Sequence, residues 1–221
     1  MKMTILGGTG RTGQWVIKEG LERGHELVAL VRDPEKIPDA SPRLQRVKGS
    51  PMSIDDVRTV VKGAETVLSA LNVNRSSDLP WAKVTSPKDL ISASIKNAID
   101  AMHEEHVKRI VVISAYGVHE TRKNIGALGR LFFYGTNIKF AYLDHERQEQ
   151  LLAASDLDWT ALRPTMLTSK DAVREVIASI DGVPKPKASI SRRNLARFIL
   201  DCAEKGLHVR QAPTVSQKQE K

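Results

Sequence analysis

The chain has 221 residues, of which 41% are hydrophobic and 27% charged, as is typical of one soluble globular domain. Cys202 is the only cysteine, so the composition excludes an intrachain disulfide and a cysteine-based metal site. The 34 basic and 26 acidic residues give a net charge of +8. Like charges do not form long runs, and the basic excess therefore favours a solvated surface with an anion-binding site over a nucleic-acid groove.

The first residues, MKMTILGG, form an apolar run that is too short for a secretory signal peptide or a membrane-spanning helix. No other segment approaches the ~18 apolar residues that a spanning helix needs. We therefore expect a cytoplasmic protein, a monomer or homodimer, without membrane or nucleic-acid partners. The histidines show no spacing typical of metal ligands, so we expect no metal site.

Apolar runs alternate with amphipathic segments along the first half of the chain. Residues 3–6 and 26–32 are apolar runs typical of buried parallel strands, and residues 12–23 between them carry Val16 and Leu21 at helical spacing. The other elements expected in this half are strands at 44–48 and 66–71, a helix at 53–62 and an irregular loop at 72–86.

The second half begins with a long amphipathic helix over 87–105. The most hydrophobic strand, 109–115, follows, and we place it at the centre of the sheet. A second irregular loop is expected from about residue 116 to 137. After this loop we expect a helix at 143–155, a strand at 158–163, a strand near 173–179, a turn at Asp181-Gly182, a helix at 191–204 and a last strand near 208–215.

Strands separated by crossover helices predict an α/β fold: a doubly wound parallel sheet of the Rossmann type, with helices on both faces. The chain shows no internal repeat or low-complexity linker, so we expect a single domain over residues 1–215. Within it, residues 164–215 are expected to form a small cap on the substrate side. Residues 216–221 are expected to be a frayed tail.

The sharpest motif is GGTGRTG at residues 7–13, directly after the first strand and at the start of a helix. Glycines at this spacing allow a tight turn, a close approach of a diphosphate to the backbone and close packing of the helix on the sheet. The free N–H groups of the new helix then face the phosphates. Thr9 and Thr12 add hydroxyl donors and Arg11 adds a cation. The alternative is a plain tight turn between strand and helix.

The end of the second strand distinguishes the two nicotinamide dinucleotides. NAD-binding domains usually place an acidic residue there for the ribose 2′-hydroxyl, whereas this chain has Arg32, whose guanidinium suits a 2′-phosphate. Asp33 is interpreted as an N-cap for the turn at Pro34. We therefore predict NADP(H) rather than NAD(H), with a solvated strand end as the alternative for Arg32.

Several segments together resemble the atypical, extended-type short-chain dehydrogenase/reductases, in the branch of NmrA-like proteins and biliverdin-IXβ or flavin reductases. The similarity covers most of the chain, and its segments are GGTGRTG, LVRDPEKIP, VKGSPMSIDDVRTVVKGAETVLSAL, RIVVISAYGV, HERQEQLLAASDLDWTALRP and ISRRNLARFILDCAE. The resemblance implies that Arg32 holds the 2′-phosphate and that Ser50 replaces an aspartate near the adenine. The cofactor-binding residues predicted from the motif and the resemblance are Gly7, Thr9, Gly10, Arg11, Thr12, Gly13, Arg32, Ser50, Ala70, Leu71, Asn72, Ser114, Ala115 and Pro164.

The chain departs from the main short-chain dehydrogenases at the catalytic pair. Their Tyr-x-x-x-Lys pair is absent, because Tyr142 is followed four residues later by Glu146. His145 takes the position where NmrA-like relatives often keep a lysine, and it would donate a proton or hold a ribose hydroxyl. A surface histidine is the alternative. The candidate catalytic residues are Ser114, Tyr116 and His145, and the alternative for Tyr116 is a loop aromatic that packs on the sheet edge.

These features suggest an NADPH-dependent oxidoreductase that passes a hydride to a flat conjugated acceptor, such as a flavin or quinone, because such acceptors need little acid–base help. The alternative is a non-catalytic NADP(H)-binding redox sensor or regulator of the NmrA-like type. A nucleotide-sugar epimerase or dehydratase ranks last, because the Tyr/Lys pair is missing. The apolar cluster at 128–134 is either an aromatic wall for the acceptor or a core or dimer patch.

Overall fold

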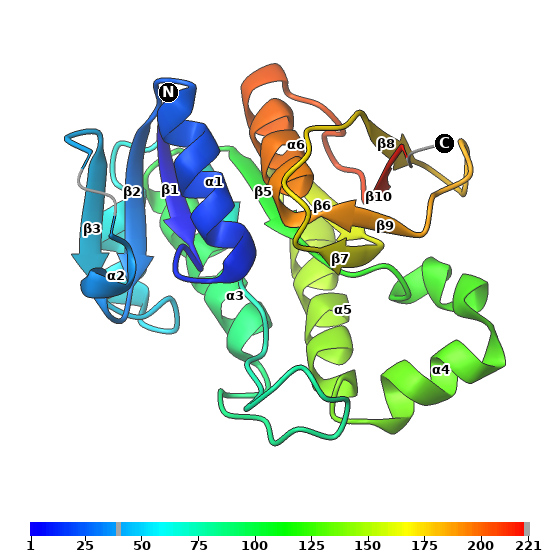
Figure 1. The fold of residues 1–221 in the computed structure, drawn as a ribbon. Coiled ribbons are helices and arrows are strands. Elements are labelled where there is room, and N and C mark those ends of the chain that lie inside the picture. Colours follow the sequence, from blue (N-terminus) through cyan, green and yellow to red (C-terminus); the bar gives the residue numbers. More distant parts are fainter. Residues whose placement is uncertain (39–40, 219–221) are drawn as a thin grey trace.

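The computed structural model describes residues 1–38 and 41–218 and contains an eight-stranded sheet flanked by helices (Figure 1). The strand order is β3-β2-β1-β4-β5-β6-β10-β8. The strands from β3 to β10 pair in parallel, and β8 is antiparallel to β10. The predicted doubly wound α/β fold is confirmed. The strands are β1 (Lys2–Leu6), β2 (Glu26–Val31), β3 (Leu44–Lys48), β4 (Thr66–Ser69), β5 (Arg109–Ile113), β6 (Asp158–Pro164), β8 (Val176–Ser179) and β10 (Thr214–Gln217).

Each face of the sheet carries its own apolar core. Helices α1 (Arg11–Glu22) and α6 (Arg192–Lys205) cover one face, and α2 (Ile54–Val61), α3 (Leu90–Glu104) and α5 (Lys139–Ala154) cover the other. Because the central strands are buried on both faces, their sequences are nearly continuous apolar runs. Among the described residues, no helix is long and apolar enough to cross a bilayer.

The strand order reverses beside β1. The chain runs outward from β1 through β2 and β3, and then crosses back to β4 on the other side of β1 before continuing to β5 and β6. In doubly wound sheets, ligands bind at the carboxyl ends of the strands at this point, because the loops that follow the two central strands diverge there. The topology therefore places a candidate site at the ends of β1, β4 and β5.

A buried carboxylate joins two helices of one face. The first turn of α3 receives its cap from Asp144 of α5, which accepts hydrogen bonds from the backbone N–H groups of Ile91 (2.7 Å) and Ser92 (3.3 Å). Burial raises the pKa of Asp144, and the bonds from Ile91 and Ser92 oppose this shift. The cap fixes α5 against α3, and α5 carries the residues that form one wall of the site.

The predicted irregular loop at 116–137 is wrong, because this segment is mostly helical. It contains the 3₁₀ helix η2 (His119–Ile125) and the helix α4 (Gly126–Gly135), and α5 then begins at Lys139 instead of residue 143. Glycines within α4 lower its intrinsic helix propensity, but contacts with α5 offset this. Phe133 of α4 stacks on Tyr142 of α5 with 4.9 Å between ring centroids.

The C-terminal region also differs from the prediction. A separate pair of parallel strands, β7 (Met166–Thr168) and β9 (Ser189–Ser191), was not predicted. The last strand is β10, which begins at Thr214, so the prediction of a frayed tail is wrong for Ser216 and Gln217, which are buried. Gln217 is held by the backbone N–H of Ser191 at 2.8 Å. Residues 219–221 lie outside the described residues.

The predicted turn at Asp181-Gly182 is confirmed. Both residues have positive φ, at 50° and 81°, and the flanking Ile180 and Val183 pair with each other.

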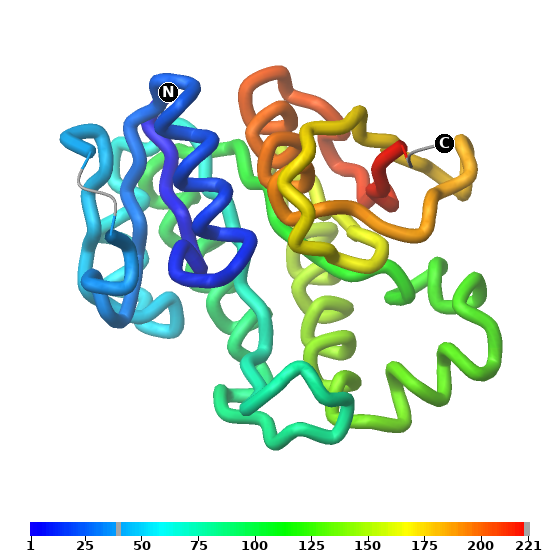
Figure 2. Tube along the Cα trace, viewed as in Figure 1, coloured from blue at the N-terminus to red at the C-terminus, as the bar shows by residue number. Residues whose placement is uncertain are grey.

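The loop between β4 and α3 lies at the same end of the molecule as α4 (Figure 2). Asn137 joins these segments, because its side chain donates to the carbonyl oxygens of Trp81 (3.0 Å) and Ala82 (3.2 Å).

Candidate functional site

The glycine loop forms a tight turn between β1 and α1. Gly7 has φ +88°, which side-chain-bearing residues rarely adopt. A Cβ at Gly13 would lie 2.1 Å from the carbonyl oxygen of Gly7, so the helix packs against the turn at a distance that only glycine permits. Gly10 is the N-cap of α1 and supplies no side-chain cap. The first N–H groups of α1 are therefore directed at the mouth of the loop without a side-chain partner from Gly10.

A cavity of about 480 Å³ lies beside this loop, at the ends of β4, β5 and β6. It combines the start of α1 with residues from α4, α5 and the segment after β6, so that elements distant in sequence form its walls. Nine of the predicted site residues line this cavity: Thr12, Ala70, Leu71, Asn72, Ser114, Ala115, Tyr116, His145 and Pro164.

Seven predicted site residues do not line the cavity: Gly7, Thr9, Gly10, Arg11 and Gly13 of the glycine loop, and Arg32 and Ser50. Arg32 is exposed directly after β2, and Asp33 accepts a hydrogen bond from the backbone N–H of Glu35 (3.3 Å) at the start of η1 (Pro34–Lys36). The interpretation of Asp33 as an N-cap is confirmed, which leaves Arg32 as the charged group at the strand end. The Ser50 hydroxyl accepts a hydrogen bond from the backbone N–H of Met52 (3.3 Å), so it takes part in its own turn.

Arg11 has a partner that the sequence did not reveal. Its two terminal nitrogens donate to the two carboxylate oxygens of Asp78, both at 2.9 Å. Hydrogen bonding to Arg11 lowers the pKa of Asp78. Both side chains are largely exposed, so this pair lies at the surface beside the glycine loop.

His145 is 4% exposed, so the alternative of a surface histidine is wrong. Burial lowers its pKa to about 4, and the imidazole is therefore neutral at pH 7. Its Nδ1 lies 3.4 Å from Nε2 of Gln148, a buried residue one turn further along α5. A neutral imidazole is a hydrogen-bond partner but a poor electrostatic substitute for the lysine of the Tyr/Lys pair.

Aromatic side chains form one wall of the cavity. Phe132, Phe133, Tyr116 and Tyr142 all line it. Of the apolar cluster at 128–134, Phe132 and Phe133 lie on this wall, whereas Leu128 and Leu131 are exposed. Burial raises the pKa of Tyr142 well above its usual value. Tyr142 is therefore poorly suited to proton donation.

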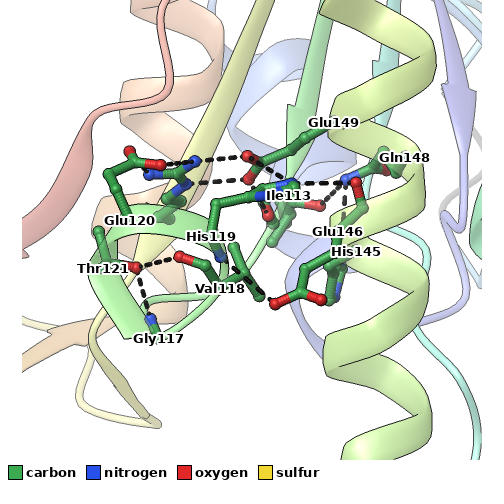
Figure 3. A network of polar contacts seen from close by, with 12 residues as sticks. Ile113, Gly117, Val118, His119, Glu120, Thr121, His145, Glu146, Gln148 and Glu149 are labelled. Carbon is green, nitrogen blue, oxygen red and sulfur yellow. Dashed lines mark hydrogen bonds and ion pairs between the residues drawn. The ribbon is translucent and has the colours of Figure 1, made fainter. Parts of the chain in front are cut away.

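Glu146, four residues after Tyr142, has other partners. It accepts hydrogen bonds from the hydroxyl of Tyr134 (2.9 Å) and from the backbone N–H of His119 (3.3 Å). Figure 3 shows Glu146 directed toward the segment that begins η2. Its role in this arrangement is to attach η2 and α4 to α5.

A buried polar network adjoins the cavity at Ser114, and Figure 3 shows Glu149 and Glu120 within this network. The Ser114 hydroxyl donates to Glu149 Oε1 at 2.5 Å. Arg163 donates to both oxygens of Glu149, at 2.9 and 2.5 Å, and also pairs with Glu120. Sequence reasoning missed Glu149 and Arg163, because no local motif marks either residue.

Comparison with protein families decides the class of this site. The model of a family described as NAD(P)H-binding matches residues 7–206. The chain belongs to the NAD(P)H-binding family. The match begins at the first glycine of the loop, and it includes every residue of this chain that lines the cavity.

Individual relatives are more distant. Cinnamoyl-CoA reductase 1 of Oryza sativa is 27% identical over 54% of this chain and 36% of its own length. The chain thus spans about a third of the length of the first curated relatives it matches. A wide-type short-chain dehydrogenase/reductase of Veillonella parvula, solved in complex with NADP, has a TM-score of 0.79 at 17% identity, covering 98% of this chain and 94% of that one. ChuY, an anaerobillin reductase of Escherichia coli O157:H7, has a TM-score of 0.78 at 15% identity, covering 100% and 99%.

The glycine loop of this NAD(P)H-binding chain fits a dinucleotide. A Cβ at Gly10 would lie 3.3 Å from the carbonyl oxygen of Gly7 and 3.9 Å from that of Ala70, and among the described residues no side chain fills this position. The N–H groups of the first turn of α1 would hold the diphosphate. Thr12, which lines the cavity, would contribute a hydroxyl.

The depressed pKa of His145 predicts how stability depends on pH. The unfolded chain binds this proton near pH 6.5, whereas the folded chain binds it near 4. Between these values the unfolded state binds more protons, so His145 lowers the free energy of unfolding as pH falls, by up to about 3 kcal/mol. Urea unfolding from pH 7 to 4 should show this decrease in the wild type, and His145→Gln should lose it.

The exposed His106 provides the control, because His106→Asn should leave the pH dependence unchanged. A difference in stability between wild type and His145→Gln that stays constant from pH 7 to 4 would contradict the assignment of a neutral, buried imidazole.

Proposed function

We propose that the chain is an NADPH-dependent oxidoreductase that passes a hydride to a flat conjugated acceptor, such as a flavin or quinone. The observation that carries this proposal is the cavity beside the glycine loop, whose aromatic wall includes the stacked pair Phe133 and Tyr142. Flat aromatic surfaces bind a flat ring with little loss of conformational freedom. A site of this kind orients two rings against each other, and the cofactor brings the hydride.

The residues of the chain supply binding and orientation in this proposal. The N–H groups at the start of α1 hold the diphosphate, and Arg32 pairs with the 2′-phosphate. Residues 70–72 and 114–115 border the cofactor at the ends of β4 and β5, and Ser50 lies toward the adenine. Met166 and Leu167 line the cavity from the segment after β6, which supports a substrate-side cap within residues 164–215.

In this proposal the proton for the reduced acceptor comes from water and not from a side chain of the site. Neither Tyr142, whose pKa is raised by burial, nor the neutral His145 replaces the Tyr/Lys pair of the main short-chain dehydrogenases. A conjugated acceptor delocalises the added charge and takes its proton from water, so it does not require that pair. A simple ketone requires it, because the alkoxide must be protonated as it forms. The resemblance to the NmrA-like and biliverdin-IXβ or flavin reductase branch agrees with this substrate class.

Oxidation of NADPH with a panel of flavins, quinones and redox dyes tests the proposal. We expect turnover well above the rate in buffer for at least one conjugated acceptor, and none for simple ketones. Tight binding of NADP⁺ without turnover across the panel would contradict an enzymatic role and support the NmrA-like redox sensor instead.

Arg32→Ala is expected to weaken NADPH binding by about 10- to 100-fold, because a charge-assisted pair with a phosphate contributes about 1.5–3 kcal/mol. NADH binding should change little, since NADH lacks the 2′-phosphate. Isothermal titration calorimetry with both dinucleotides measures this difference. Arg130→Ala, at an exposed arginine of α4, is the matched control. Equal losses for NADH and NADPH in Arg32→Ala would contradict the assignment.

A further inference from the structure

The hydrogen bonds around His145 determine which of its ring nitrogens carries the proton. Gln148 Nε2 lies 3.0 Å from the carbonyl oxygen of Ile113. A carbonyl oxygen only accepts hydrogen bonds, so the NH₂ end of the Gln148 amide, and not its oxygen, must face Ile113. The same nitrogen lies 3.4 Å from Nδ1 of His145, which must then act as the acceptor. The neutral ring therefore carries its proton on Nε2.

The Nε2–H of His145 has no acceptor among the residues that the structure describes, and His145 lines the cavity. The imidazole thus offers the cavity a donor. Gln148 Oε1 is itself buried without a described partner, so the amide is held by its nitrogen alone.

Ser114 presents a hydrogen-bond acceptor to the cavity, whereas His145 presents a donor. The hydroxyl proton of Ser114 is committed to Glu149, whose carboxylate is fixed by two bonds from Arg163. The Ser114 oxygen keeps lone pairs but has no proton to give, so it presents an acceptor. Gln148 and Glu149 are consecutive in α5, and they bind the consecutive residues Ile113 and Ser114. The donor and the acceptor therefore lie on adjoining parts of one cavity wall.

We infer that this wall recognises a planar edge in which a carbonyl stands beside an N–H: a carboxamide, lactam or imide. His145 donates to the carbonyl oxygen, and Ser114 accepts from the N–H. Gln148 and Glu149 are positioning residues that fix these roles. Two ligands contain such an edge: the nicotinamide, in its carboxamide, and an acceptor such as a flavin, in its imide. The inference rests on the proposed function for the second ligand.

Nitrogen-15 NMR of the full chain, with labelled histidine, tests the donor. His145 should be the Nε2–H tautomer at pH 7, and its signals are assigned by their loss in His145→Gln. Gln148→Glu should shift the ring toward the Nδ1–H tautomer, because a carboxylate accepts where the amide donated. Gln148→Met, which removes the donor without adding an acceptor, should give a mixture. An Nδ1–H tautomer in the wild type would overturn the inference.

Two binding comparisons test the acceptor and distinguish the two ligands. Calorimetry compares NADP⁺ with its 3-acetylpyridine analogue, which keeps the carbonyl but lacks the N–H. Fluorescence titration of the NADP⁺-saturated chain compares lumiflavin with 3-methyllumiflavin, whose imide N–H is blocked. Discrimination of about tenfold is expected in one arm, and Ser114→Ala should reduce it to about twofold. Ser94→Ala, a buried serine of α3 that donates to the carbonyl of Leu90, should keep the wild-type ratio.

Each result has a distinct meaning. Discrimination in the first arm assigns the edge to the nicotinamide, and discrimination in the second assigns it to the acceptor. The absence of discrimination in both arms, or discrimination that survives Ser114→Ala, overturns the inference. Because both arms measure binding, they fail independently of the turnover assay, so a loss of this inference is distinguishable from a loss of the proposed function.

Discussion

Replacing Gly13 with alanine is expected to weaken NADPH binding by about 100-fold and to lower the free energy of unfolding by about 3 kcal/mol. The added Cβ would lie 2.1 Å from the Gly7 carbonyl oxygen and 2.9 Å from the Cα of Gly8. Both neighbours are backbone atoms, which cannot rotate away as a side chain does. The start of α1 must therefore move from the turn, and the N–H groups that face the diphosphate move with it. Calorimetric titration and urea unfolding measure the two effects.

Gly20→Ala is the matched control in the same helix. A Cβ at Gly20 would approach side-chain tips of Leu27, the nearest at 3.2 Å, which can yield by a few tenths of an ångström. Alanine also has the better helix propensity, so the stability of this variant should stay within about 1 kcal/mol of the wild type. NADPH binding by Gly13→Ala within twofold of the wild-type affinity would show that the diphosphate does not use this turn.

The layout of the sheet could be predicted because its signals are local. Strands β1 to β6 are short apolar runs separated by amphipathic segments, and their observed bounds differ from the predicted ones by a few residues at most. The glycine loop is equally local, since seven consecutive residues specify a turn and a helix start. Its position directly after β1 then follows from the chain order, and the switch point beside β1 follows from the topology.

The segments that were predicted wrongly depend on contacts with distant elements. Helix α4 contains Gly126, Gly129 and Gly135, and its form depends on packing of Phe133 against Tyr142 of the next helix. Strand β10 pairs with β8 and β6, which are not its neighbours in sequence. Propensity alone could not reveal either element, because the stabilising partners are chosen by tertiary structure.

The same reason limits prediction of the site. Nine of the predicted site residues do line one cavity. The partners that fix their chemistry were missed, because their pairings span 14 to 67 positions of sequence, as for Arg163 with Glu149 and Arg11 with Asp78. The burial of His145 was also undecided, since a histidine in a charged helical segment looks the same in sequence whether it faces solvent or a cavity.

The second large effect is expected at Arg163, where Arg163→Met should lower the free energy of unfolding by about 3–5 kcal/mol. The side chain of Arg163 is 4% exposed and that of Glu149 is 6% exposed, so the variant leaves a buried carboxylate without its guanidinium. The Ser114 hydroxyl remains on Glu149, and His119 lies 3.7 Å from it, but neither carries a permanent charge. Urea unfolding at pH 7 measures the loss.

A double substitution separates two contributions to the lost free energy of unfolding: the cost of burying the unpaired Glu149 carboxylate and the net contribution of the Arg163–Glu149 pair. Replacing both partners, as Arg163→Met with Glu149→Leu, removes the stranded charge and should recover more than half of the lost stability, since a buried pair contributes little over apolar packing. Arg58→Met, which breaks an exposed pair with Glu104, should change stability little. If the double variant is no more stable than Arg163→Met, the loss comes from packing around the guanidinium. Recovery of stability in the double variant would show that the loss in Arg163→Met comes from the unpaired buried carboxylate.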